Sequence, residues 1–176
     1  MSGVERIEQL IRNIPDFPKP GIQFKDITPV LSSPSGLAAA VTEMLERSPD
    51  TVDIVAGIES RGFIFGAPMA LMLHVGFVPI RKPGKLPAPV FEQNFDLEYG
   101  SSTLAIHQDA VRPGQKVLLV DDLLASGGTL VAAAKLIERC GATVVHTTVL
   151  VELAELGGRQ MMAEAGLTTV SSVVTY

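Results

Sequence analysis

The sequence predicts an α/β protein with a central parallel sheet flanked by helices. Three observations predict this fold: short apolar strands alternate with helices, glycine-containing loops separate them, and the strands are apolar along their whole length. Buried parallel strands also explain the mean hydropathy of +0.33. With 176 residues and one cysteine, the chain fits a single domain over 1–176 that folds without disulfide bonds.

Prolines separate the elements of the first part of the chain. Apolar residues at helical spacing predict a helix over 4–14 that stops at Pro15. The proline-rich segment from there to Gly21 excludes a regular element, and a short strand is expected from Ile22. A helix over 34–47 follows, because a serine and a proline introduce it.

Strand–loop–helix units make up most of the remaining chain. Runs rich in β-branched residues and periodic apolar segments predict strands over 52–58, 76–81, 116–120 and 143–151, and helices over 62–73 and 129–139. Such alternation predicts binding residues at the carboxyl ends of the strands. The longest uncharged run, 62–80, contains proline and glycine turn signals, so a buried helix and a strand explain it better than a membrane span.

Residues 82–100 interrupt this pattern. The segment contains three prolines, mixed charges and no clear period, and it is longer than most connections within a compact domain. It is therefore interpreted either as a tolerated surface insertion or as a functional loop.

The strongest local pattern is the run VLLVDDLLASGGTL over 117–130. An apolar strand brings Asp121 and Asp122 to the edge of the sheet, where carboxylates suit ribose hydroxyls or a Mg²⁺ shell. The small residues that follow open a helix whose backbone N–H groups can bind a phosphate: Ala125, Ser126, Gly127, Gly128 and Thr129. The absence of a lysine separates this run from a Walker A loop. The alternative is an ordinary strand-to-helix turn capped by Thr129.

A phosphate on the loop and a hydroxylated sugar on the acids together describe a ribose 5-phosphate. The run resembles the phosphoribosyl pyrophosphate (PRPP) motif of the type I phosphoribosyltransferases. This resemblance implies that family's fold, with a small N-terminal hood over 1–33 and a flexible catalytic loop over 82–100. The run also resembles the acidic strand end of response-regulator receivers, but there an acceptor aspartate follows, and no aspartate follows Asp122.

Pyrophosphate, the leaving group of this family, needs a second anion site. Arg61 follows a strand and precedes a buried helix, so its guanidinium and the helix N-terminus can act together. The alternative is a surface arginine paired with Glu59. By resemblance, the bond Glu59–Ser60 is the candidate for a non-proline cis peptide.

The resemblance gives the segment 82–100 the role of a lid. Departure of pyrophosphate leaves an oxocarbenium-like centre that bulk water would intercept, so the site is expected to close. By resemblance, the stem of the loop supplies Arg81, Lys82 and Lys85 to pyrophosphate. Glu98, within FDLEYG, is the catalytic residue that takes the N7 proton of the base, although without this resemblance it reads as a solvated surface charge.

The stretch PDFPKPGIQFKDITPVL over 15–31 resembles the N-terminal signature of the adenine-specific members of the family. By resemblance, Phe24 stacks on the purine, backbone groups of Gln23 and Lys25 read its 6-amino group and N1, and Leu153 closes its other face. Such backbone reading favours adenine, because hypoxanthine presents the opposite pattern at both atoms. The family often carries an apolar residue at position 23 and an arginine at position 25.

The four motifs together imply a purine salvage enzyme that converts adenine and PRPP to AMP and pyrophosphate. Mg²⁺ is expected to be held mainly by PRPP, with no direct protein ligand, and the enzyme is expected to be a homodimer in which Arg81 can reach the partner's site. A formal charge of −5 and an N-terminus unlike a signal peptide predict a cytoplasmic protein without nucleic-acid or membrane partners. The alternatives are a hypoxanthine/guanine or xanthine phosphoribosyltransferase, and a non-catalytic regulator of the same fold that senses PRPP or purines.

Overall fold

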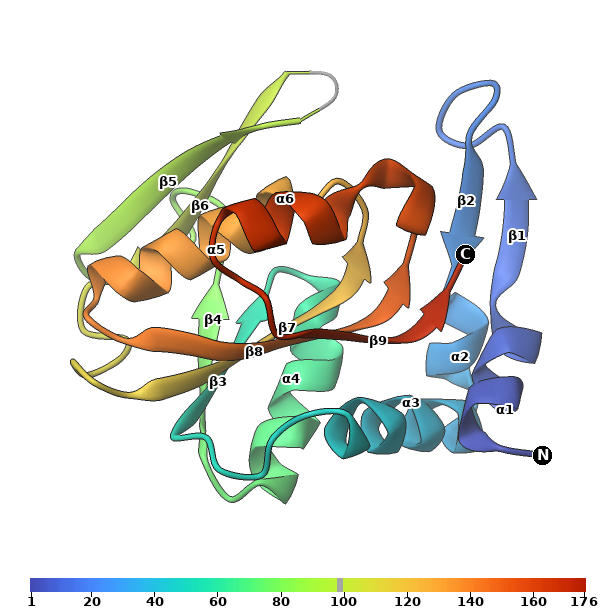
Figure 1. The fold of residues 1–176 in the computed structure, drawn as a ribbon, viewed down its shortest axis with the longest axis horizontal. Helices are drawn as coiled ribbons and strands as arrows, with labels where there is room; N and C mark the ends of the chain where they lie inside the picture. The colour runs from blue at the N-terminus through green and yellow to red at the C-terminus, as the bar shows by residue number, and fades with distance from the viewer. Residues whose placement is uncertain (98–99) are drawn as a thin grey trace.

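The computed structural model, which describes residues 1–97 and 100–176, confirms the parallel α/β prediction (Figure 1). Its main sheet has five strands in the order β4-β3-β7-β8-β9, and all neighbouring strands are parallel. The strands are β3 (Ile54–Ile58), β4 (Gly76–Ile80), β7 (Lys116–Leu124), β8 (Thr143–Glu152) and β9 (Val170–Thr175). Strand β7 occupies the centre of this sheet.

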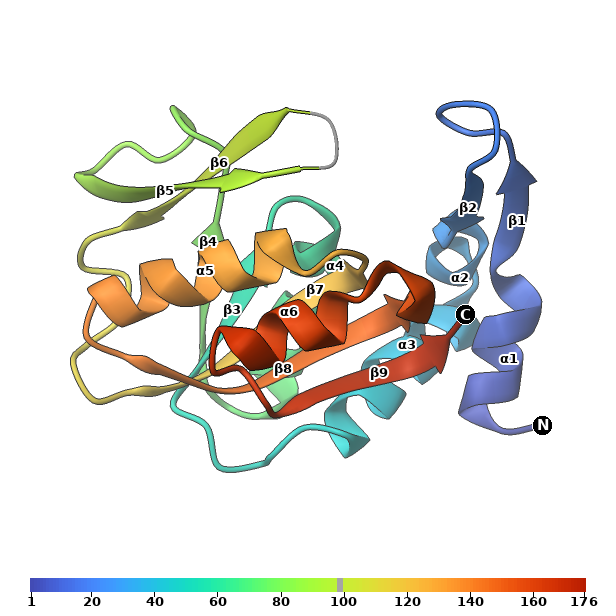
Figure 2. The same cartoon turned by 45° about the horizontal axis from the view of Figure 1, so that its top comes forward.

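Helices cover both faces of the sheet, as Figures 1 and 2 show. Helices α3 (Pro34–Glu46) and α4 (Arg61–Met72) lie on one face, and α5 (Gly128–Arg139) and α6 (Gly158–Glu164) lie on the other. The short helix η1 (Ala154–Leu156) lies between β8 and α6 along the chain. Successive residues of β7 alternate between the two buried clusters: Leu118 and Val120 pack on the α4 side, Val117 and Leu119 on the α5 side. Because both faces are covered, this strand is apolar on both.

A small unit, which we call the hood, stands at one end of the sheet. It comprises α1 (Gly3–Leu10), β1 (Arg12–Pro15), β2 (Gln23–Asp26) and α2 (Thr28–Ser32), and its two strands are antiparallel. The prediction of a helix through Ile14 is wrong, because the helix ends at Leu10 and Ile14 pairs with Phe24 of β2. Pro15 disfavours the helical conformation of Ile14 before it, and Ile14 instead adopts the extended conformation of a strand.

The segment 82–100 is more ordered than its sequence predicts. Strand β5 (Val90–Asp96) pairs antiparallel with β6 (Ser101–His107), so the prediction of a segment without regular structure is wrong for this part. Half-buried and exposed residues alternate from Phe91 to Asp96, but the half-buried position between the two phenylalanines is Gln93, which weakens the apolar period. Arg139 of α5 donates a hydrogen bond to the carbonyl of Glu92 at 2.6 Å and lies over the ring of Phe91, which anchors the hairpin to α5.

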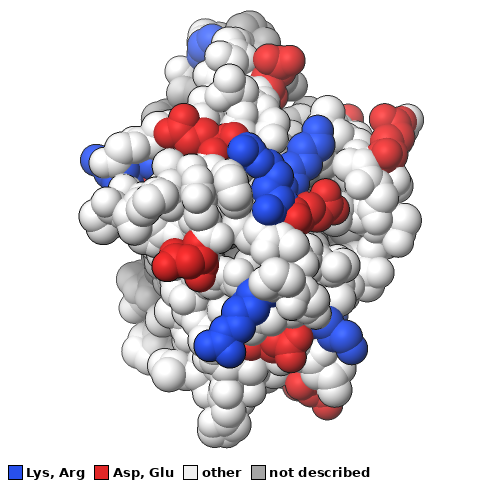
Figure 3. All heavy atoms as spheres, turned by 90° about the vertical axis from the view of Figure 1, so that its left-hand side faces the viewer, with Lys and Arg blue, Asp and Glu red and all other residues white. Residues whose placement is uncertain are grey.

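Most other predicted elements lie within two residues of their expected bounds. The uncharged run 62–80 forms most of α4 and all of β4, and no helix in the described ranges is long and apolar enough to cross a membrane. On the face shown in Figure 3, acidic and basic side chains are interspersed rather than gathered by sign.

Burial on α4 leads to a stability prediction for two adjacent residues. Phe65 is fully buried, whereas the side chain of Ile64 is 39% exposed. We expect Phe65→Ala to lower the free energy of unfolding by about 3–5 kcal/mol, because it leaves a cavity in the core. Ile64→Ala is the matched control and should cost less than about 1 kcal/mol in urea unfolding. Equal losses for both variants would contradict this packing.

Candidate active site

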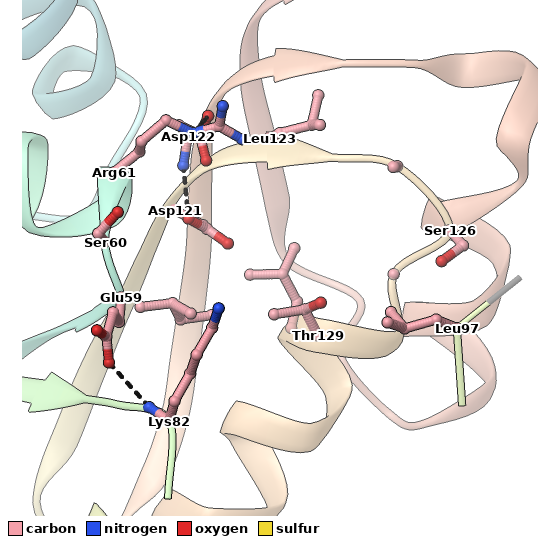
Figure 4. Close-up of a pocket in the computed structure, with 14 residues that line it drawn as sticks. Glu59, Ser60, Arg61, Lys82, Leu97, Asp121, Asp122, Leu123, Ser126 and Thr129 are labelled. Carbon is pink, nitrogen blue, oxygen red and sulfur yellow. Dashed lines mark hydrogen bonds and ion pairs between the residues drawn. The ribbon is translucent and has the colours of Figure 1, made fainter. Parts of the chain in front are cut away.

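The carboxyl ends of β3 and β7 form the centre of the site (Figure 4). The pairing of β3 with β7 ends where Gly57 lies opposite Val120, so the two following aspartates lie beyond the paired part of the two strands. Helix α4 begins there and packs directly on β7: a Cβ added at Gly62 would lie 2.8 Å from the Val120 carbonyl oxygen. The two strand ends, the small-residue loop and Lys82 line a cavity of about 480 Å³.

Asp121 and Asp122 are both buried at the wall of this cavity. The prediction that this strand ends at residue 120 is wrong, because β7 continues to Leu124 in parallel pairing with β8. The N–H of Asp122 donates to Asp121 Oδ1 at 2.9 Å, and the Asp122 carboxylate pairs with Arg61 Nε at 2.7 Å. Arg61 therefore pairs with Asp122 and not with Glu59.

Burial raises the pKa values of both carboxyls. For Asp121 the negative charge of Asp122 raises the pKa further, while for Asp122 the guanidinium of Arg61 opposes the effect of burial. A buried pair of this kind gains when hydroxyl donors or a cation approach it, because either one compensates for lost hydration. The pair is thus suited to bind a hydroxylated sugar.

The small-residue loop leads into α5 with its backbone N–H groups available. Gly127 is the N-cap, with a left-handed φ of 90°, and within the described chain no side chain caps the helix, so the alternative of a Thr129 cap is wrong. Of the residues expected to bind phosphate, Ala125, Ser126, Gly127 and Thr129 line the cavity. Gly128 does not line it but begins the helix.

The basic residues divide between the cavity and its support. Arg61 and Lys82 line the cavity, and Arg81 and Lys85 do not. Arg81 instead pairs with Glu59 at 3.3 Å and donates to the carbonyl of Lys85 at 3.2 Å.

Lys82 points into the cavity, as Figure 4 shows, and the N–H of Lys82 donates to Glu59 at 2.9 Å. This hydrogen bond, more than the Arg81 charge, lowers the pKa of Glu59. Neighbouring side chains of an extended segment point in opposite directions, which explains why Lys82 lines the cavity and Arg81 does not. This alternation could have been inferred from the sequence. The Glu59–Ser60 peptide bond is cis, as the resemblance implied.

A second, narrower cavity adjoins the first. It is lined by all four residues expected to bind the base, Gln23, Phe24, Lys25 and Leu153, and shares Arg61, Asp122 and Leu123 with the first cavity. The hood supplies one side and the end of β8 the other. Leu153 is held there by its N–H, which donates to the Leu124 carbonyl at 2.9 Å.

The side chains of Gln23 and Lys25 are occupied elsewhere. Asn13 donates to the amide oxygen of Gln23 at 3.1 Å, and the Lys25 ammonium lies 3.8 Å from the ring centre of Tyr176. Phe24 meets Phe17 edge to face, with 5.1 Å between ring centres. The polar ends of both side chains are thus engaged, which leaves their backbone groups as candidates to face the second cavity.

Glu98 lies outside the described residues. Leu97, directly before it, is the last described residue on that side, and it lines the first cavity. In the described ranges no three His, Cys, Asp or Glu side chains gather in a way that could hold a metal ion. Sequence reasoning placed neither Leu97 nor Leu123 at the site, because both carry only the ordinary signal of an apolar residue.

A small-residue loop after the central strand, two buried acids and an adjoining cavity under a hood are the arrangement expected of a phosphoribosyl-transferring class of α/β protein. The family model described as "Phosphoribosyl transferase domain" matches residues 23–173. An adenine phosphoribosyltransferase of Cutibacterium acnes is 56% identical over 96% of this chain and 96% of its own length.

Solved structures agree with this assignment. The adenine phosphoribosyltransferase of Thermoanaerobacter pseudethanolicus has a TM-score of 0.93 at 47% identity, covering 98% of this chain and 99% of its own. The corresponding enzyme of Giardia lamblia, complexed with 9-deazaadenine, has a TM-score of 0.92 at 42% identity, covering 100% and 98%. The chain belongs to the phosphoribosyl transferase family and, within it, to the adenine phosphoribosyltransferases.

The raised pKa of Asp121 leads to a prediction about stability and pH. Burial and the charge of Asp122 hold the pKa of the folded state well above the ordinary aspartate pKa of about 3.9, so the folded state loses stability as pH rises from about that value through the raised pKa. Asp121→Asn keeps the Oδ1 acceptor for the Asp122 N–H but removes the charge. We expect the variant to be more stable than the wild type near pH 8, with a free energy of unfolding about 1–2 kcal/mol higher. The difference in this free energy should be smaller near pH 4.5.

Urea unfolding at both pH values measures this difference. Asp50→Asn, at an exposed position, is the control and should change stability little at either pH. A loss of stability in Asp121→Asn near pH 8 would contradict the charge argument.

Proposed function

We propose that the chain transfers the 5-phosphoribosyl group of PRPP to N9 of adenine, producing AMP and pyrophosphate. The observation that carries this proposal is the pair of adjoining cavities, one with a phosphate loop and one under the hood, which share Arg61, Asp122 and Leu123. A nucleoside monophosphate has the same arrangement, with its ribose between the phosphate and the base. The relatives named as adenine phosphoribosyltransferases support adenine as the base.

In the proposed mechanism the first cavity binds PRPP. The 5-phosphate accepts hydrogen bonds from the N–H groups of Ser126, Gly127, Gly128 and Thr129 at the start of α5, where the helix dipole favours an anion. Asp121 and Asp122 accept hydrogen bonds from the ribose hydroxyls. This arrangement orients the anomeric carbon toward the second cavity, so that adenine needs no further movement to attack it.

The cations act on the leaving group. Arg61 and Lys82 face the first cavity, and they stabilise the negative charge that grows on pyrophosphate as its bond to the anomeric carbon breaks. We keep Arg81 and Lys85 as pyrophosphate ligands in a closed state of the lid over 82–100. For Arg81 this requires release from Glu59, because its guanidinium is paired there in this structure.

Backbone atoms of β2 are proposed to select adenine. In the described part β2 pairs only with β1, so one of its edges has no strand partner. Pro15, which lacks an N–H, lies opposite Gln23, and this fits a non-hydrogen-bonded pair in which the backbone groups of Gln23 and Lys25 face the free edge. A carbonyl and an N–H there match the 6-amino group and N1 of adenine, while Phe24 and Leu153 enclose the ring.

Glu98 remains the proposed acid–base residue. It takes the N7 proton as N9 attacks the anomeric carbon and returns it in the reverse reaction.

Mg²⁺ is proposed as the cofactor, brought in on PRPP. Asp121 and Asp122 offer oxygen ligands of the kind that Mg²⁺ prefers, but Asp122 is paired with Arg61, and the described residues hold no larger acidic cluster. This donor set fits an ion held mainly by the substrate's phosphate and hydroxyl oxygens, with at most one carboxylate beside it. The ion supplies charge neutralisation on the phosphates.

We further propose that the chain is one phosphoribosyltransferase domain over 1–176, active as a homodimer in the cytoplasm. The exposed apolar side chains of α4 support association of two copies, since Leu71 is 76% and Met72 58% exposed. The free, buried thiol of Cys140 is compatible with a reducing compartment.

An assay with four bases tests the proposed function. With PRPP and Mg²⁺, adenine should give AMP, while hypoxanthine, guanine and xanthine should give less than about 1% of that rate, because each presents the wrong hydrogen-bonding pattern to β2. Nucleotide formation is followed by chromatography. Failure to form AMP, or faster formation of IMP or GMP, would overturn the proposal.

Glu98→Gln tests the acid–base role. We expect kcat to fall by about 10²–10⁴-fold, because glutamine cannot accept the N7 proton. Glu92→Gln, at an exposed position of β5 in the same hairpin, is the matched control and should retain activity. Unchanged turnover of adenine in Glu98→Gln would show that another group moves the proton.

A further inference from the structure

The start of α6 packs on the phosphate loop, backbone against backbone. A Cβ atom added at Gly158 would overlap the carbonyl oxygen of Ala125 and lie 2.7 Å from the Leu124 side chain. From the other side, a Cβ added at Gly127 would lie 2.8 Å from the carbonyl oxygen of Gly158. The contact is therefore as close as it is because neither residue has a side chain.

Close approach, and not backbone conformation, explains the glycine at position 158. Gly157, the N-cap of α6, has a φ of 68°, whereas Gly158 is not among the glycines with positive φ. In the first turn of a helix alanine would ordinarily be preferred over glycine. Alanine, which the helix would favour at position 158, is excluded here because its Cβ would overlap Ala125 of the small-residue loop.

Arg159 prevents the start of α6 from moving away from the loop. Its Nε donates to Glu152 of β8 at 2.9 Å, and its Nη1 donates to the carbonyl of Val170 at the start of β9 at 2.7 Å. The Glu152 carboxylate is buried and also accepts a hydrogen bond from Ser172 Oγ at 2.7 Å. A side chain at position 158 would thus displace the loop, because the helix is pinned to two strands.

The stretch from Glu152 to Arg159 also contributes to the second cavity. Leu153 follows Glu152 directly and lines the second cavity, and the chain then passes through η1 to Gly158. The ion pair of Glu152 with Arg159 therefore closes a short segment that lines the second cavity through Leu153 and packs on the small-residue loop through Gly158.

We propose that Gly158 is a positioning residue for the phosphate loop and that Arg159 holds it in place. Gly158 does not line the first cavity. Its bare backbone sets the position of Ala125, Ser126 and Gly127, and so the direction of the N–H groups that receive the 5-phosphate. This inference deepens the proposed function and rests on it, because phosphate binding by the loop is part of that function.

Gly158→Ala tests the proposal, with Gly76→Ala as the matched control. A Cβ at Gly76 would lie 3.7 Å from the nearest atoms, which is ordinary contact. We expect Gly158→Ala to raise the KM for PRPP and the Kd for ribose 5-phosphate at least tenfold, because the displaced N–H groups lose hydrogen bonds to a charged phosphate. The KM for adenine should stay within about twofold, and Gly76→Ala should match the wild type throughout.

Two results would overturn the proposal. One is an unchanged KM for PRPP and an unchanged Kd for ribose 5-phosphate in Gly158→Ala. The other is a lower melting temperature and kcat with both KM values unchanged, which is the signature of a merely structural role. If the wild type formed no AMP, the proposed function would fall, and binding of ribose 5-phosphate by calorimetry would still decide the role of Gly158.

A double variant covers the case in which Gly158→Ala does not fold. Arg159→Met with Glu152→Gln removes the pin without leaving a buried charge, and glutamine can still accept from Ser172. We expect a severalfold higher KM for PRPP and a higher Kd for ribose 5-phosphate, because the start of α6 can then recede from the loop. Wild-type values of both in this variant would contradict the role of the pin.

Discussion

The whole site depends on the length of β7, which extends past its pairing with β3 at the carboxyl edge of the sheet. The pairing of β3 with β7 ends at Val120, while β7 continues with β8 to Leu124. Beyond that point one side of the central strand is no longer paired with β3, and the N-terminus of α4 and the first cavity lie beside it. Asp121, Asp122 and Arg61 meet there for this reason.

Local charge, and not the overall balance, decides what this edge can bind. The chain carries a formal charge of −5, yet the small-residue loop at the start of α5 offers backbone amides as donors to an anion, and these add no formal charge. Arg61 and Lys82 are turned toward the first cavity, and the neighbouring carboxylates hold them or their backbones in place. An acidic protein can thus present a site for a polyanion when a few cations are oriented by buried acids.

The rest of the site comes from segments that leave the sheet and return to its carboxyl edge. The hood and the β5–β6 hairpin both rise on the same side of the molecule, one at each end, as Figure 1 shows. The hood brings Phe24 opposite Leu153, and the hairpin brings the carbonyl of Asp96 beside Gly128. Glycine contacts then bring α4 close to the end of β7 at Gly62, and α6 close to the small-residue loop at Gly158.

The sequence by itself determined the parallel sheet and the place of a small-residue loop after an acidic strand end, because both rest on local patterns. Apolar strands and the fourteen consecutive residues over 117–130 carry those signals without reference to distant parts of the chain, whereas the residues expected around the base came from resemblance to a known family.

Tertiary structure decided the features that need a partner far away in the sequence. Examples are the end of α1 at Leu10, the strand within 82–100 and the extension of β7 past Val120, all of which depend on pairing with other strands. The choice of Asp122 as partner of Arg61 and the need for glycine at 158 are of the same kind. Side-chain direction and close backbone contact arise only when separate elements pack together, so no local pattern contains them.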